Sequence, residues 1–183
     1  KFPSGAEIKN LGREAVCMTC HQGNASMVSV DDAIKKANSK EDDTVVAELG
    51  FVNIHYFAAS VARYGTLVKG GYEYSGKAYD AVWQHAAGIN TCIDCHNSHT
   101  LEIKLETCKG CHTGVSRVED IRSIRMMSSS RDYDGDGNVK EGIAAEVDGV
   151  RAMLLAAIQA YATEVAKSPI AYDAASYPYF FID

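Results

Sequence analysis

The sequence lacks the features that would place it in several common classes of protein. No hydrophobic run approaches the roughly 18 residues that a membrane-spanning helix needs, and the opening stretch from Lys1 to Gly5 has no hydrophobic signal core. Basic residues are the minority, 18 Lys and Arg against 24 Asp and Glu, so a groove that binds nucleic acid phosphates is not expected. We therefore expect a soluble chain without a transmembrane segment, whose signal peptide has been removed if the protein is exported.

No cysteine lies outside one short motif. All six occur in three copies of Cys-x-x-Cys-His, whose residues are Cys17, Cys20 and His21, then Cys92, Cys95 and His96, then Cys108, Cys111 and His112. Two thiols at this spacing form thioethers to the two vinyl groups of one haem, and the next His binds the iron. One copy alone would also suit half of a zinc site or a redox pair. Three copies that use every cysteine predict three covalently attached haems c instead.

The histidines match the axial positions of three haems. Six His are present, and three of them end the motifs, which leaves His55, His85 and His99. Three haems with a protein ligand on both faces need six axial ligands, so we expect these three to be the distal ligands. Methionine is the competing distal ligand. The available residues are Met18, Met27, Met126, Met127 and Met153, of which Met18 lies within a motif and is the least suitable.

Spacing suggests how the distal ligands are assigned. His55 falls on the apolar face of a helix expected over residues 44–64, and we expect it to reach haem 1 opposite His21. His99 follows His96 by only three residues, too few to reach both faces of one iron. We therefore assign His99 to haem 3, opposite His112, which leaves His85 for haem 2. The 16 residues from Cys92 to Cys108 place haems 2 and 3 close together.

The rest of the sequence predicts a mainly α fold with long haem-wrapping loops and little or no β structure. Helices are expected over about residues 29–38, 44–64, 116–127 and 143–167, with one or two turns at 79–87. The apolar stripe of 143–167 is the clearest, whereas 1–28 and 69–77 are expected to be loops. We predict one domain over 1–183, with segments 1–43 (haem 1), 44–115 (distal His helix and haems 2 and 3), 116–167 (helical pair) and 168–183 (aromatic tail).

Between the two helices of that pair lies an acidic loop. Residues 132–139 match the first eight positions of an EF-hand loop, with turn-forming Gly137 at position 6, and predict a Ca²⁺ site. The loop ligands would be Asp132, Asp134, Asp136 and the carbonyl of Asn138. Position 12 holds Ile143 instead of the usual Glu, so either Glu141 or Glu146 is the candidate replacement. The alternative is a solvated acidic turn.

Residues 55–112 combine His-Tyr, Gly-Gly-Tyr-Glu-Tyr, Cys-x-x-Cys-His-x-x-His and a further Cys-x-x-Cys-His. This segment resembles the multihaem c-type cytochromes of metal-respiring and related anaerobic microbes. The resemblance implies a periplasmic or extracellular location, low-spin haems with two His ligands, and electron transfer to redox partner proteins or extracellular acceptors. Some proteins of this group polymerise into extracellular filaments. The motifs specify haem and leave the assembly state open.

Three functions are compatible with this pattern. The first is electron transfer, either by a soluble periplasmic carrier or by a polymerised haem conduit. The second is a multihaem reductase, which needs an open iron position and is disfavoured by six His for six positions. The third is a structural or docking role. Five of the fifteen Tyr and Phe lie in the last twelve residues, and this tail is expected either to cover a haem edge in its own subunit or to pack on a neighbouring one.

Overall fold

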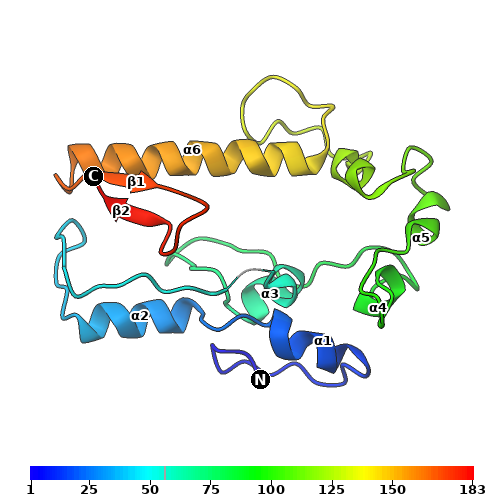
Figure 1. The fold of residues 1–183 in the computed structure, drawn as a ribbon, viewed down its shortest axis with the longest axis horizontal. Helices are drawn as coiled ribbons and strands as arrows, with labels where there is room; N and C mark the ends of the chain where they lie inside the picture. The colour runs from blue at the N-terminus through cyan, green and yellow to red at the C-terminus, as the bar shows by residue number, and fades with distance from the viewer. Residues whose placement is uncertain (56) are drawn as a thin grey trace. The chain divides into compact units, whose positions relative to one another are not determined.

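The computed structural model describes residues 1–55 and 57–183, which form two compact units (Figure 1). Unit 1 comprises Lys1–Leu101 and contains the first two Cys-x-x-Cys-His motifs, and unit 2 comprises Glu102–Asp183 and contains the third. Both consist of helices and loops, with one small two-stranded hairpin in unit 2, so the predicted fold class is confirmed. Within the described ranges, no helix is long and apolar enough to cross a membrane.

Unit 1 is built from short helices joined by long loops. Its elements are α1 (Glu14–His21), α2 (Met27–Lys36), α3 (Ala59–Tyr64), the 3₁₀ turn η1 (Gly65–Leu67) and α4 (Cys92–Cys95). Phe2, Met18, Tyr64 and Val68 form a small hydrophobic core, in which the rings of Phe2 and Tyr64 meet edge to face at 6.1 Å. Because α1 contributes Met18 to this core, the first motif is anchored on packed structure.

The helix predicted over 44–64 is wrong for most of its length, because α3 begins only at Ala59. Asn53 competes with helix formation, since its side-chain oxygen accepts the backbone N–H of His55 at 2.8 Å in a local turn. His55 and Phe57 then adopt left-handed backbone angles, φ 76° and 54°. The predicted helical residue Tyr56 lies outside the described residues. His55 is therefore a loop residue.

Three further local predictions for unit 1 need correction. The stretch 1–28, expected as loop, contains α1 and the start of α2, because residues 14–21 hold no Gly or Pro to interrupt a helix. The predicted start at 29 moves to Met27, since Ser26 caps the helix and Ser29 bonds back to the N–H of Ser26. Residues 79–87 form no helix. There the backbone N–H of Trp83 donates to the carbonyl of Arg63 instead.

Unit 2 is dominated by one long helix. Its elements are α5 (Leu105–Lys109), the 3₁₀ turn η2 (Val118–Ser123), α6 (Ile143–Glu164), β1 (Ile170–Tyr172) and β2 (Phe180–Ile182). The α6 prediction is confirmed near its expected bounds. The helix expected over 116–127 is instead the short η2. It is capped by Asp120, whose carboxylate accepts the N–H groups of Ser116 and Arg117.

The aromatic tail forms the hairpin. Strands β1 and β2 pair antiparallel with Ile170 opposite Ile182, and the rings of Tyr172 and Phe180 lie 5.0 Å apart. Strand β1 contacts α6, and the side-chain amide of Gln159 on that helix donates to the carbonyl of Ile170. The tail is therefore an ordered element of unit 2, a pairing that strands of only three residues did not signal in the sequence.

Candidate functional site

Each Cys-x-x-Cys-His motif lies on or beside a helical turn. The first occupies the C-terminal half of α1, the second forms α4 with His96 directly after it, and the third begins on α5 at Cys108. A helical turn brings residues three apart to the same side, so the two cysteines of a motif can attach to one ligand. None of the six cysteines forms a disulfide in the described structure. The arrangement fits thioether attachment to a haem at each motif.

Two of the motif histidines are held in the tautomer that binds iron. Nδ1 of His21 donates to the carbonyl oxygen of Phe57 at 2.5 Å, and Nδ1 of His96 donates to that of Leu101 at 3.0 Å. A carbonyl oxygen only accepts hydrogen bonds, so in a neutral ring the proton is on Nδ1 and the lone pair is on Nε2. Such a bond also fixes the ring orientation of a metal-binding His.

The three histidines outside the motifs share one type of backbone contact. An Asn side-chain oxygen accepts the backbone N–H of each: Asn53 for His55 at 2.8 Å, Asn90 for His85 at 2.9 Å, and Asn97 for His99 at 2.9 Å. All three imidazoles are exposed. Sequence reasoning missed these asparagines, although an Asn two residues before a His outside the motifs recurs at two of the three positions.

Glu14 joins the helices of the first two motifs. Its side chain is buried on α1 and accepts the backbone N–H of Cys92 at 2.8 Å, while its partner in an ion pair is Arg63 on α3. Burial opposes ionisation, but the hydrogen bonds from Cys92 and Arg63 outweigh it and lower the pKa of Glu14. Burial and the nearby carboxylate raise the pKa of the free Cys92 thiol to about 11. No sequence motif indicated Glu14 or Arg63.

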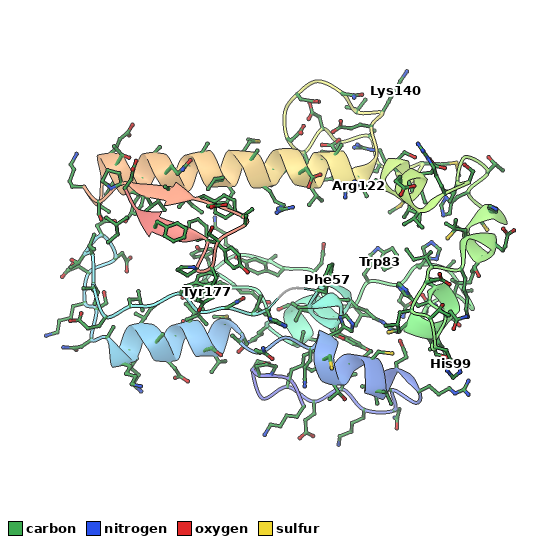
Figure 2. The ribbon with its side chains drawn as sticks, viewed as in Figure 1. Phe57, Trp83, His99, Arg122, Lys140 and Tyr177 are labelled. Atoms are coloured by element: carbon green, nitrogen blue, oxygen red, sulfur yellow. The ribbon has the colours of Figure 1, made fainter. Side chains whose placement is uncertain are left out.

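Large apolar side chains are exposed around the motifs of unit 1. Val16 on α1, Phe57, Trp83 and Leu101 are 78%, 75%, 61% and 71% exposed. Phe57 and Trp83 are labelled in Figure 2. The ring of Trp83 lies 5.6 Å from that of His85. Large contiguous patches of exposed apolar side chains mark binding surfaces, and a porphyrin is a planar, largely apolar ligand that such side chains could contact. The donor set and these surroundings therefore fit haem.

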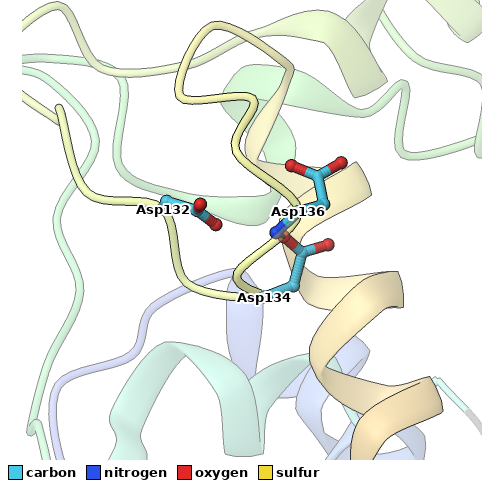
Figure 3. A group of neighbouring side chains, drawn as sticks. All are labelled: Asp132, Asp134 and Asp136. Carbon is cyan, nitrogen blue, oxygen red and sulfur yellow. Dashed lines mark hydrogen bonds between the residues drawn. The ribbon is translucent and has the colours of Figure 1, made fainter.

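The acidic loop of unit 2 brings its three aspartates together. One carboxylate oxygen from each of Asp132, Asp134 and Asp136 lies within 4.8 Å of the others (Figure 3). The carboxylate of Asp132 accepts the N–H groups of Gly137 at 2.8 Å and Gly135 at 2.6 Å, and these bonds lower its pKa. Gly135 and Gly137 have positive φ, 78° and 90° respectively, which a tight loop of this kind requires.

Glu141 and Glu146 complete a second acidic group with Asp134, but their surroundings differ. Glu146 is 1% exposed and fully bonded: Arg125 pairs with one oxygen, and the other accepts the N–H of Tyr133 at 2.7 Å. The bond from Arg125 is the main reason that the pKa of Glu146 is lowered. Burial, followed by the charges of neighbouring carboxylates, raises the pKa of Glu141, and its Oε1 is buried without a hydrogen-bond partner.

Two residues that support this loop carry no sequence signal. The guanidinium of Arg125 pairs with Glu146 and also donates to the carbonyls of Ser129, Arg131 and Glu141. Gly149 on α6 gives the Asp134 carboxylate room, because a Cβ at this position would collide with it. The loop is therefore stabilised by the guanidinium of Arg125 and packs tightly against α6.

Together, the three attachment motifs and the hydrogen-bonded imidazoles define binding sites of the c-type haem kind. The chain has distant similarity to the C-type polyheme cytochrome OmcB of Geobacter sulfurreducens, in strain DL-1 / KN400 and in strain ATCC 51573. The identity is 33% over an alignment of 128 residues, which covers 55% of this chain and 16% of OmcB. No family model and no solved structure matches the chain.

Proposed function

We propose that the protein transfers electrons through three covalently bound haems c, each with two His ligands. The observation that carries this proposal is the pair of hydrogen bonds that fix His21 and His96 as Nε2 ligands within complete attachment motifs. His112 ends the third motif, and His55, His85 and His99 supply the distal positions. The similarity to a polyhaem cytochrome supports the same conclusion.

When bound, each haem supplies an iron that gains and loses one electron. The cysteines would hold it covalently, and two of the motif histidines, His21 and His96, would bind it in an orientation set by the carbonyls of Phe57 and Leu101. Two histidines for each iron would leave no iron position open to a substrate or gas molecule. Bis-imidazole ligation lacks the thioether that raises the potential of His/Met haems, so we expect low potentials. These features favour an electron carrier or conduit over a reductase.

We further propose that the protein acts outside the cytoplasm, in the periplasm or at the cell exterior, and assembles into a polymerised conduit. The support for assembly is the exposed aromatic hairpin: Tyr177 and Ile182 are 67% and 81% exposed on an ordered element. Apolar groups presented in this way suit a contact with a second copy. A contact between different surfaces of successive copies repeats without closing and gives a filament. A soluble periplasmic carrier is the alternative.

The acidic loop is proposed to bind Ca²⁺ through Asp132, Asp134, Asp136, the carbonyl of Asn138 and the side chain of Glu141. Of the two glutamates considered, Glu141 is the better ligand, because its Oε1 has no hydrogen-bond partner while both oxygens of Glu146 are engaged. Glu146 then positions the loop and does not coordinate the ion. Ca²⁺ prefers such clusters of carboxylate and carbonyl oxygens, and its role here is to stabilise unit 2.

Mass spectrometry and optical spectroscopy of the holoprotein test the haem proposal. We expect three haem additions per chain, one fewer when both cysteines of any one motif are changed to Ala, and low-spin spectra that carbon monoxide does not alter. Fewer than three additions in the wild type would contradict the haem count. A high-spin iron or carbon monoxide binding would favour the reductase alternative.

Titration calorimetry with Ca²⁺ tests the acidic loop. We expect Ca²⁺ to bind to the wild type and to raise its Tm. Glu141→Gln should lower the affinity at least about tenfold because one ligand is lost, and the rise in Tm should be smaller. Glu164→Gln, an exposed residue at the end of α6, is the matched control and should leave binding unchanged. Equal binding by the Glu141 variant would show that another group completes the site.

A further inference from the structure

Two segments of unit 1 share one arrangement of residues and hydrogen bonds. Each contains an Asn, a His two positions later and an apolar residue four positions later: Asn53, His55 and Phe57 in residues 53–57, and Asn97, His99 and Leu101 in residues 97–101. We call these segments the first and second Asn-His modules. In both, the Asn side chain accepts the N–H of the His, at 2.8 and 2.9 Å.

The last residue of each module holds the proximal histidine of a motif. Nδ1 of His21 donates to Phe57 of the first module, and Nδ1 of His96 donates to Leu101 of the second. Phe57 and Leu101 both have positive φ, 54° and 63°, although neither is a glycine. A non-glycine residue adopts this conformation only where its surroundings enforce it. The same uncommon backbone state at the same position indicates that aiming this carbonyl is a property of the module.

We propose that the non-motif histidine of each module ligates a haem other than the one whose proximal histidine that module holds. His55 then serves a haem other than haem 1, the haem attached to Cys17 and Cys20. His99 serves a haem other than haem 2, attached to Cys92 and Cys95. This proposal rests on the proposed bis-His ligation of three haems and concerns only how the ligands are distributed.

The reach of the chain carries the argument. The Phe57 carbonyl lies behind the His21 imidazole, on the proximal side of haem 1, because Nδ1 points away from the iron that Nε2 binds. A distal histidine has its Cα on the opposite side, one imidazole length beyond the iron. Two imidazoles and the iron therefore separate that Cα from the Cα of Phe57 by more than about 10 Å, whereas the chain between the Cα atoms of residues 55 and 57 reaches at most about 7 Å. The chain would also have to pass around the edge of the porphyrin.

The same geometry applies to the second module. Leu101 lies behind His96, and His99 is again two residues away, so it is confined to the proximal side of haem 2. This agrees with the assignment of His99 from spacing alone. For His55 the proposal replaces the expected pairing with His21, which relied on a helix over 44–64 that the structure does not contain. Haem 1 then takes its distal ligand from His85 or His99.

A module of this kind fixes two haems relative to each other. Its carbonyl orients the proximal imidazole of one haem, and two residues away its histidine binds the iron of another. Five residues, closed by the Asn turn, therefore set the separation of two neighbouring haems. Close and constant spacing is what efficient transfer between haems requires, so the module gives unit 1 a structural basis for passing electrons from one haem to the next.

Nuclear magnetic resonance of the fully reduced, diamagnetic holoprotein tests the proposal without a substitution. The ring protons of an axial histidine lie close to the meso protons of the haem that it binds. We expect contacts from His55 to the meso protons of a haem other than haem 1, and from His99 to those of a haem other than haem 2. A contact from His55 to haem 1 would overturn the proposal. A missing haem or a high-spin iron would instead count against the proposed function itself.

Carbon monoxide binding gives an independent test. His55→Ala leaves one iron without a distal ligand, so the reduced variant should bind one carbon monoxide per chain. Adding Cys17→Ala and Cys20→Ala removes haem 1, and we expect the extra carbon monoxide site to persist, measured against the haem 1 deletion alone. Loss of that site would overturn the proposal. His99→Ala combined with Cys92→Ala and Cys95→Ala makes the matching test for haem 2, with the same two outcomes.

Discussion

Glu14 on α1 accepts the backbone N–H of Cys92, the first residue of α4, at 2.8 Å. The same carboxylate is ion-paired with Arg63 on α3. Through this single side chain, the helices that carry the first and second attachment motifs are tied to each other and to the small core around Tyr64. The contact therefore constrains where the first and second attachment motifs lie relative to each other.

Glu14→Gln should destabilise unit 1 by about 2 kcal/mol, because it leaves the partly buried Arg63 without a charged partner. The pKa of Glu14 is lowered from its ordinary 4.5, so its contribution is present above about pH 4.5 and is lost as the pH falls through the lowered value. Melting curves at a series of pH values should show a Tm difference between wild type and variant that is constant near neutrality and shrinks in acid. Glu7→Gln, at an exposed site, should show no difference at any pH. A gap that persists unchanged in acid would argue against this role for the charge.

Arg125→Met should lower the Tm of the protein by on the order of 5–10 °C. The substitution leaves the buried Glu146 without its cation and removes the donors to three loop carbonyls. Arg117→Met is the matched control, since the Arg117 side chain is itself 74% exposed in its ion pairs, and its effect should be small. Calorimetry of both variants makes the comparison, and equal melting temperatures would mean that the buried pair does not support the loop.

Gly149→Ala should weaken cation binding by the acidic loop and lower the Tm in the presence of Ca²⁺. The added Cβ collides with the carboxylate of Asp134, which must leave its place beside Asp132 and Asp136. Gly114→Ala adds the same methyl group where no atom lies within 4 Å, and Ca²⁺ titrations of the two variants provide the measurement. Indistinguishable affinities would show that Asp134 is not a ligand.

Tyr177→Ser combined with Ile182→Ser should prevent assembly while keeping the hairpin. Both side chains are largely exposed, so removing them costs unit 2 little packing but removes apolar surface offered to a second copy. Deleting residues 171–183 is the stronger form of the change. Light scattering and electron microscopy of wild type and variants decide the matter. A wild type that stays monomeric at high concentration, or a truncated chain that still polymerises, would remove the idea.

The attachment residues and the long helix could be predicted from sequence because their signals are local. Attachment of a haem needs two cysteines three residues apart and a His directly after the second. The five consecutive residues of a motif are therefore enough to predict it. The helix α6 likewise shows in an apolar stripe that repeats over many turns. The helix prediction for 44–58 was wrong although the apolar residues there have a similar periodicity. The side chain of Asn53 and the left-handed backbone of His55 and Phe57 turn the chain away from a helix.

The sequence alone determined how many Cys-x-x-Cys-His motifs the chain contains and which cysteines and histidines it offers to a haem. Only the tertiary structure decided how those ligands are oriented. His21 and Phe57 are 36 residues apart, and Glu14 and Cys92 are 78 apart. Arg125 reaches Glu146 across 21 residues to form the most buried ion pair of the described structure. Such contacts depend on loop paths that no short pattern specifies, because each of them follows from how the chain turns between its helices.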